Sequence, residues 1–287
     1  MIDLHTHTTA SDGTYSPGEL IQAAVEARLD ALAITDHDTF AGYEEARPAA
    51  QAAGLELICG IELSTKMPVP GRPRGKSVHL LGYFPVKPPS EEFREWIRLL
   101  QASRHDRNRR LAVRLRELGL EITIEEVIEV GRSMAGRPHF ARVLVEKRYV
   151  ATLQEAFDKY LDESAEAYVE REEPALAEGI RRIADGGGVP SIAHPIRLGR
   201  RSAQQEEDLV RQMSKMGLLA IEAYHSDHAP RDLERYQLLA RRYGLAVTGG
   251  TDFHGDAKPG LKLGTGRENN VSVPNKVLDR LKQLVRS

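Results

Sequence analysis

Along the chain, short apolar runs take turns with segments in which apolar residues have the spacing of a helix. Short apolar runs are typical of strands buried in a sheet, and they occupy residues 2–5, 31–35, 55–63, 77–84, 189–193, 218–224 and 246–250. Segments with the spacing of amphipathic helices lie between them, at residues 17–28, 40–53, 203–216 and 230–243. This alternation predicts βα units and a parallel sheet, and about seven regularly spaced strands favour a barrel-like closure.

The middle of the chain breaks this rhythm. Residues 88–180 are charged and helical in pattern, with one long stretch at 91–118. We therefore expect an α/β protein in which residues 1–87 and 181–287 form a barrel domain. Residues 88–180 would form a helical insertion domain between two barrel strands. The Pro- and Gly-rich residues 67–75 predict a mobile loop.

The composition is that of a globular protein, with 41% hydrophobic residues, 29% charged residues and a formal net charge of -2. This balance argues against a protein that holds long nucleic acid or an anionic membrane by charge alone. No apolar stretch approaches the roughly 20 residues of a membrane helix. The first residues lack the basic and apolar regions of a signal peptide. We expect a cytoplasmic protein with no membrane partner.

Histidines and carboxylates gather at or near the ends of the apolar runs, with one aspartate in the first loop. These residues are His5, His7, Asp12, His37, Glu62, His79, His194, Asp252 and His254. In a parallel barrel the carboxyl ends of the strands share one face, and imidazole and carboxylate groups are ligands for divalent metals. A single histidine at a strand end is more often structural than a ligand. Nine candidate ligands are more than one tetrahedral ion can use, so they predict a multinuclear centre.

These residues lie in short motifs. The motifs are His5-Thr6-His7 followed by Asp12, Thr35-Asp36-His37-Asp38, Gly60-Ile61-Glu62, Val78-His79, Ala193-His194-Pro195 and Thr251-Asp252-Phe253-His254. Together they resemble the polymerase-and-histidinol-phosphatase (PHP) family of phosphoesterases. The most similar branch hydrolyses 3',5'-nucleotide bisphosphates and includes 5'-to-3' exoribonucleases. The resemblance implies a distorted (β/α)7 barrel with a helical insertion after the fourth strand.

The resemblance also implies three metal sites. Their ligands would be His5, His7, Glu62 and Asp252 for the first; Glu62, His79 and His194 for the second; and Asp12, His37 and His254 for the third. Many family members have histidine where this chain has Asp12, so a weaker or altered third site is expected. The resemblance implies two or three divalent ions, with Mn²⁺ as the first choice and Zn²⁺ or Fe²⁺ as alternatives.

Such a centre cleaves phosphate esters through in-line attack of a metal-bound hydroxide on phosphorus. Arg137, Arg197 and His225 are candidate phosphate contacts, because guanidinium binds phosphate through paired hydrogen bonds and His225 ends the penultimate strand. Arg197 and His225 are also candidate catalytic residues, with His225 as a proton donor to the leaving group. The alternative for each is a surface salt bridge or a cap.

One stretch of the insertion is rich in arginine and includes Arg104, Arg107, Arg109, Arg110, Arg114 and Arg116. Interleaved acidic residues favour a solvated helix face. The alternative is a path for RNA or a lid over a nucleotide, with Trp96, Phe140 or Tyr149 stacking on a base. His105, His139 and His228 are interpreted as structural.

The expected function is removal of the 3'-phosphate from a 3',5'-bisphosphorylated nucleotide, such as adenosine 3',5'-bisphosphate (pAp). One alternative is a 5'-to-3' exoribonuclease that uses the same site on 5'-phosphorylated RNA. Another small-molecule phosphatase, of the histidinol-phosphate type, and a non-catalytic metal-binding scaffold are further alternatives. The expected partners are a small nucleotide or the 5' ends of RNA, and not DNA. The oligomeric state is left open.

Overall fold

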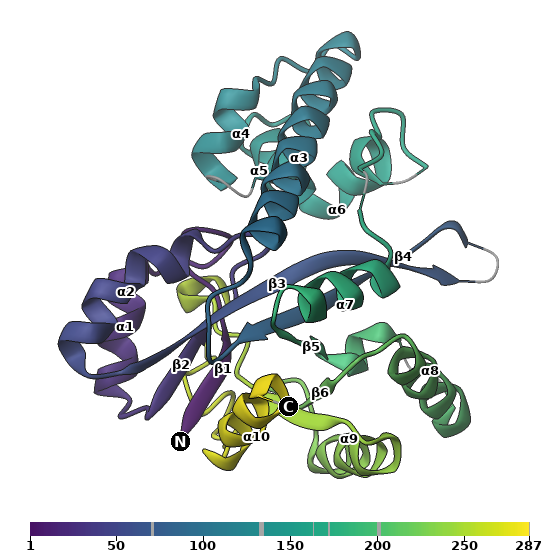
Figure 1. The fold of residues 1–287 in the computed structure, drawn as a ribbon. Coiled ribbons are helices and arrows are strands. Elements are labelled where there is room, and N and C mark those ends of the chain that lie inside the picture. Colours follow the sequence, from purple (N-terminus) through teal and green to yellow (C-terminus); the bar gives the residue numbers. More distant parts are fainter. Residues whose placement is uncertain (70–71, 132–134, 163, 172, 200–201, 287) are drawn as a thin grey trace.

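The strands of the protein form one curled sheet. The computed structural model describes residues 1–69, 72–131, 135–162, 164–171, 173–199 and 202–286. The strands follow chain order across the sheet: β1 (Ile2–Thr6), β2 (Ala31–Ile34), β3 (Glu56–Val69), β4 (Arg72–Phe84), β5 (Val189–Ile192), β6 (Ala220–Tyr224) and β7 (Ala246–Gly249). Each corresponds to a strand expected from the sequence, which confirms the barrel-like α/β fold (Figure 1).

The expectation of a parallel sheet is wrong for β4. This strand runs antiparallel to both of its neighbours, β3 and β5, whereas the other neighbouring strands pair in parallel. The reason is that β3 and β4 form a hairpin, and a parallel pair would need a longer crossover. The loop expected at 67–75 is therefore mostly strand. Residues 70–71 of that segment lie outside the described residues.

The two edges of the sheet meet where β1 and β7 end. Thr6 bridges to Phe253, and the His7 backbone N–H donates to the Phe253 carbonyl at 2.8 Å. The buried Asp3 carboxylate accepts hydrogen bonds from the Thr251 backbone N–H at 2.9 Å and from its hydroxyl at 2.6 Å. These contacts bring the ends of the first and last strands together.

Helices cover the sheet: α1 (Pro17–Glu26), α2 (Ala41–Ala53), α7 (Leu176–Asp185), α8 (Ala203–Lys215), α9 (Pro230–Tyr243) and α10 (Lys276–Arg286). Local sequence sets their ends. Ser16 and Glu19 form a capping box at the start of α1. Helix α2 ends at Gly54, whose φ of 68° is left-handed and suits glycine.

The insertion has its own apolar core. It contains α3 (Glu91–Glu117), α4 (Ile124–Gly131), α5 (Arg137–Glu146), α6 (Leu153–Ala156) and a π-helical turn, η2 (Phe157–Leu161). One apolar cluster extends from Leu111 to Val169, and these helices stand to one side of the sheet in Figure 1. Helix α7 instead packs against β3, β4 and β5. The division into domains at 88 and 180 stays a prediction. None of the described helices has the length and apolar character needed to cross a bilayer.

Candidate metal centre

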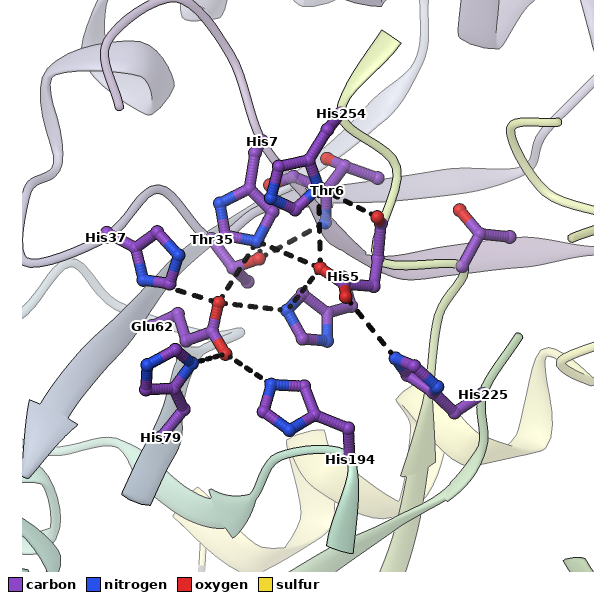
Figure 2. A network of polar contacts seen from close by, with 12 residues as sticks. His5, Thr6, His7, Thr35, His37, Glu62, His79, His194, His225 and His254 are labelled. Carbon is purple, nitrogen blue, oxygen red and sulfur yellow. Dashed lines mark hydrogen bonds and ion pairs between the residues drawn. The ribbon is translucent and has the colours of Figure 1, made fainter. Parts of the chain in front are cut away.

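Glu62, near the middle of β3, is the carboxylate around which the histidines gather (Figure 2). Its Oε2 lies 3.2 Å from Nε2 of His5 and 3.1 Å from Nε2 of His7. Its Oε1 lies 2.9 Å from Nδ1 of His79 and 2.9 Å from Nε2 of His194. A carboxylate contacted through both oxygens can bridge two metal ions.

Asp252 and Asp12 hold the other side of the cluster. Asp252 Oδ1 lies 3.5 Å from His5 Nε2 and 3.4 Å from His7 Nε2. Asp12 Oδ1 lies 3.3 Å from His254 Nε2, and Asp12 Oδ2 lies 3.6 Å from His37 Nε2. The structure thus brings together all nine residues that the sequence suggested as ligands.

Buried carboxylates outside the candidate ligand set hold these ligands in position. Glu222 on β6 contacts His5 Nδ1 at 2.8 Å and accepts a hydrogen bond from the His194 backbone N–H at 2.6 Å. Asp36 accepts hydrogen bonds from the Thr8 backbone N–H at 2.7 Å and the Ser11 hydroxyl at 2.6 Å, which fixes the loop that carries Asp12. Such partners orient metal ligands and set the histidine tautomer.

Three residues of the site have a left-handed backbone. The φ angles are 51° for Asp38, 27° for His194 and 58° for Asp252. A conformation of this kind costs on the order of 1–3 kcal/mol at a residue other than glycine, and it clusters at functional sites. Here it turns the chain sharply as each strand ends.

Burial sets the protonation of the cluster. It lowers the pKa of His37 to about 4 and that of His194 to about 4, even though nearby carboxylates oppose the shift. Burial alone would raise the pKa of Glu222, but His5 and His225 hold that pKa at about 2. At neutral pH the imidazoles of His37 and His194 are therefore neutral and Glu222 is ionised. For His5, His7 and His79 the neighbouring carboxylates outweigh burial and raise the pKa, to about 9 for His7, so binding of a metal ion there would displace a proton.

The donor set fits divalent ions. Ligand atoms of His5, His7, Glu62 and Asp252 all lie within 4.8 Å of one another. The same holds for His7, Asp12, His37 and His254, and for His37, Glu62 and His79. Nitrogen and oxygen donors without thiolate suit ions such as Mn²⁺, Fe²⁺ and Zn²⁺.

A cavity of about 330 Å³ opens beside the cluster. The barrel contributes Asp12, His37 and His79 to its lining. Its cationic lining residues are Lys66, Arg104, Arg107, Arg137 and Arg171. Asp12 and Glu173 are the carboxylates that line the described part of the cavity, so positive charge is in excess. The volume lies in the range of small-ligand pockets.

The PHP domain model matches residues 3–172 of the chain. The chain belongs to the PHP family. It is 30% identical to a 3',5'-nucleoside bisphosphate phosphatase from Chromobacterium violaceum, over 92% of this chain and 90% of that protein. It is 34% identical to the 5'-3' exoribonuclease Rnm of Salmonella typhimurium, over 91% of this chain and 87% of that one.

A solved structure from Bifidobacterium adolescentis, described as a metal-dependent phosphoesterase, has the same fold. The TM-score is 0.73 at 32% identity, and the match covers 97% of this chain and 96% of that one. This PHP protein is thus an enzyme, a metal-dependent phosphoesterase with a His/Asp/Glu cluster able to bind metal ions.

The three candidate phosphate contacts of the PHP chain lie in different surroundings. Arg137, at the start of α5, lines the cavity. Arg197 lies beside the cluster, with its Nη1 3.0 Å from Asp252 Oδ2, and its side chain is 41% exposed. His225 is buried behind Asp252, with Nε2 3.5 Å from Asp252 Oδ2. Lys258, which sequence reasoning missed, is 2.6 Å from the same Asp252 oxygen.

The expected solvated face of the insertion is wrong for two arginines. Arg107 is buried and the Arg104 side chain is 11% exposed, and both line the cavity. The remaining four arginines of that set, Arg109, Arg110, Arg114 and Arg116, are exposed as expected. The difference arises because α3 turns one face toward the barrel.

The aromatic residues suggested for base stacking lie elsewhere. Trp96 and Phe140 are buried in apolar clusters, and the Tyr149 hydroxyl accepts a hydrogen bond from the Glu121 backbone N–H at 3.0 Å. Tyr168 is the aromatic side chain that lines the described cavity, together with the Arg137 guanidinium above its ring.

The three histidines interpreted as structural have these surroundings. His105 is half-buried on α3, and His228 Nδ1 contacts the Ala223 carbonyl at 2.7 Å. His139 accepts a hydrogen bond from the Gly136 backbone N–H at 3.0 Å and also lines the cavity.

Sequence reasoning also missed Glu222, Asp38 and Arg171. A charged residue inside the apolar run 218–224 was the available signal for Glu222. Arg171 gave no local signal, because its place depends on how the chain returns from the insertion.

Proposed function

We propose that this PHP enzyme removes the 3'-phosphate from 3',5'-bisphosphorylated nucleotides and converts pAp to AMP and phosphate. One observation carries the proposal: a single cavity joins the metal-ligating cluster of the barrel to arginines of the insertion. A substrate with two phosphate groups can place one at each. A substrate with one phosphate would leave the buried Arg107 guanidinium without a phosphate as its counter-charge.

The charge on Arg107 supports this arrangement. Burial and the nearby Arg104 and Arg171 lower the pKa of Arg107 to about 9. Its Nε is buried without a hydrogen-bond partner among the described residues. A phosphate group offers the acceptors and the charge that this guanidinium requires.

Divalent ions held by the nine cluster residues would supply a nucleophilic hydroxide and offset charge on the phosphoryl oxygens. Side chains of the protein would bind and orient the substrate. Arg104, Arg107 and Arg171 would hold the 5'-phosphate and so orient the nucleotide. Glu222 holds His5 in position through its contact with Nδ1. Arg197, the exposed cation beside Asp252, would bind the phosphate as it is released.

A 5'-to-3' exoribonuclease is the second candidate. The chemistry is the same, since the ester at the 3'-oxygen of a 5'-phosphorylated nucleotide is cut in both. The exposure of Arg197 beside the cluster favours it, because a continuing RNA chain could pass there. The similarity to the exoribonuclease of Salmonella typhimurium supports the same alternative.

Product analysis separates these functions. Mn²⁺-loaded protein is incubated with pAp and, separately, with a short 5'-phosphorylated RNA. Release of AMP and phosphate from pAp is expected. Stepwise release of nucleoside 5'-monophosphates from the RNA as well would make the enzyme an exonuclease that also clears bisphosphates. If pAp stays intact under conditions in which the RNA or another phosphate ester is cleaved, the proposed function is wrong.

A further inference from the structure

Asp38 follows His37 directly and is anchored to two elements. Its Oδ1 accepts a hydrogen bond from the Ser64 backbone N–H at 2.7 Å, and its Oδ2 accepts one from the Ser64 hydroxyl at 2.9 Å. The Gln101 side chain on α3 donates to the Asp38 carbonyl at 2.8 Å. The side chain is fully buried, so its position is fixed from both the barrel and the insertion.

The same carboxylate holds two arginines of the cavity. Oδ2 of Asp38 forms an ion pair with Arg104 of α3 and another, at 2.9 Å, with Arg171. Arg171 lies where the chain returns from the insertion to the barrel, so the two arginines come from opposite ends of the insertion. Both line the cavity, and the Nε atom of each is buried without a hydrogen-bond partner among the described residues.

The charges explain why one buried carboxylate is needed there. Arg104 and Arg171 are close enough to Arg107 to lower its pKa, in addition to the effect of burial. Without a carboxylate between them, Arg104 and Arg171 would repel each other and separate. The two guanidinium groups in contact with Asp38 favour the ionised form of its carboxylate.

We infer that Asp38 is a positioning residue, which fixes Arg104 and Arg171 for the second phosphate and thereby aligns the reacting phosphate on the metal centre. The inference rests on the proposed function. His37 belongs to the metal cluster and Asp38 holds the arginines. Because these two residues are neighbours in the chain, one short segment sets the distance between the reacting phosphate and the second phosphate. Misplacement of a reacting group by about 1 Å can cost on the order of 100-fold in rate.

Asp38→Asn gives a specific expectation for kcat and KM. The asparagine keeps the shape but removes the charge, so the cavity becomes more positive and still attracts phosphate. We expect the KM for pAp to stay level or fall. The arginines lose their anchor, so kcat for pAp is expected to fall at least about 10-fold. The kcat for adenosine 3'-monophosphate, which has no second phosphate, is expected to change less than about 3-fold.

The experiment measures phosphate release from both substrates by wild type, Asp38→Asn, Ser64→Ala and the control Asp106→Asn, an exposed carboxylate on α3. Ser64→Ala removes the hydroxyl that donates to Asp38 and accepts from Arg104 at 3.4 Å. It tests the same effect if Asp38→Asn does not fold, and it should show the same selective loss, smaller in size. Asp106→Asn should match wild type.

Two kinds of result overturn the inference. An equal loss of kcat on both substrates would show a general structural role, and a higher KM for pAp with unchanged kcat would show simple binding. The wild-type enzyme decides the proposed function separately. If it cleaves neither substrate, the proposed function and the inference both fail, whereas cleavage of pAp with no selective loss in the variants removes the inference alone.

Discussion

At the scale of single residues, Glu62 is the side chain with the most contacts to candidate ligands. Imidazoles of His5, His7, His79 and His194 lie within 3.2 Å of its two oxygens. No other carboxylate that the structure describes in the cluster contacts as many at such distances. The two ligand groups that contain it would therefore lose a shared member if it were changed.

Glu62→Gln should abolish most activity and lower the metal content. The amide keeps the size of the side chain but loses the charge and one acceptor oxygen. Changes to partners outside the ligand shell typically cost about 10- to 100-fold, so a shared ligand should cost more than about 100-fold. Metal analysis and phosphate release are the measurements, with the exposed Glu129→Gln as control. Full activity with a full metal complement would rule out the bridging role.

The candidate ligand residues could be picked out because most of them have a local signal. A histidine or carboxylate that ends an apolar run is visible in the sequence, and the motifs around His5 and His194 add to it. The residues behind the ligands were not predictable in the same way. Asp38 matters through Arg104 and Arg171, which lie 66 and 133 positions further along the chain, and no periodic pattern encodes such a contact.

At the scale of elements, strand and helix positions followed from apolar periodicity, but strand direction did not. The sequence between β3 and β4 is rich in Pro and Gly, which can indicate either a loop or a hairpin turn. The hairpin reverses β4, so His79 enters the site from just past the middle of its strand, opposite Ser64. Whether two successive strands run parallel or antiparallel depends on the number of residues between them. Because β3 and β4 are longer than expected, few residues remain between them.

The start of α2 supports the loop that carries Asp12. A Cβ on Gly42 would lie 2.0 Å from Asp36 Oδ2 and 2.5 Å from the Thr8 hydroxyl. Gly42→Ala should therefore lower the free energy of unfolding by about 1–3 kcal/mol, as overpacking does. It should also weaken metal binding through Asp12.

Gly18→Ala is the matched control, because Gly18 is likewise the second residue of its helix and a Cβ there meets no atom within 4 Å. This change should be neutral or stabilise the protein by up to about 1 kcal/mol. Urea denaturation measures both variants. Equal stability of the two variants would contradict the role assigned to the contact between Gly42 and Asp36.

At the scale of the whole molecule, the candidate metal centre brings together segments from both ends of the chain. His5 lies in the first strand, and Asp252 and His254 follow the last one. The curled sheet and insertion were expected from the sequence, whereas the way α3 turns Arg104 and Arg107 toward the barrel was not. That orientation depends on packing between the insertion and the sheet.

Metal binding should therefore stabilise the entire fold. An ion at 100 times its dissociation constant adds about 2.7 kcal/mol, and for a chain of this size each kcal/mol raises the Tm by roughly 2 °C or more. Mn²⁺ added to chelator-treated protein is expected to raise the Tm by at least about 5 °C, and Glu62→Gln should lose most of that rise. Thermal unfolding followed by fluorescence is the measurement. A Tm that does not respond to Mn²⁺, Zn²⁺ or Fe²⁺ would count against a metal centre at this place.

The central claim is that one cavity uses the metal cluster to cleave one phosphate and the arginines to bind another. The most direct test compares kcat/KM for pAp with that for adenosine 3'-monophosphate, in wild type, Arg107→Gln and the exposed control Arg109→Gln. Wild type and the control should prefer pAp, and Arg107→Gln should reduce that preference by about 10- to 100-fold, as expected for a charged hydrogen bond to phosphate. An unchanged preference in Arg107→Gln, or none in the wild type, would contradict the account.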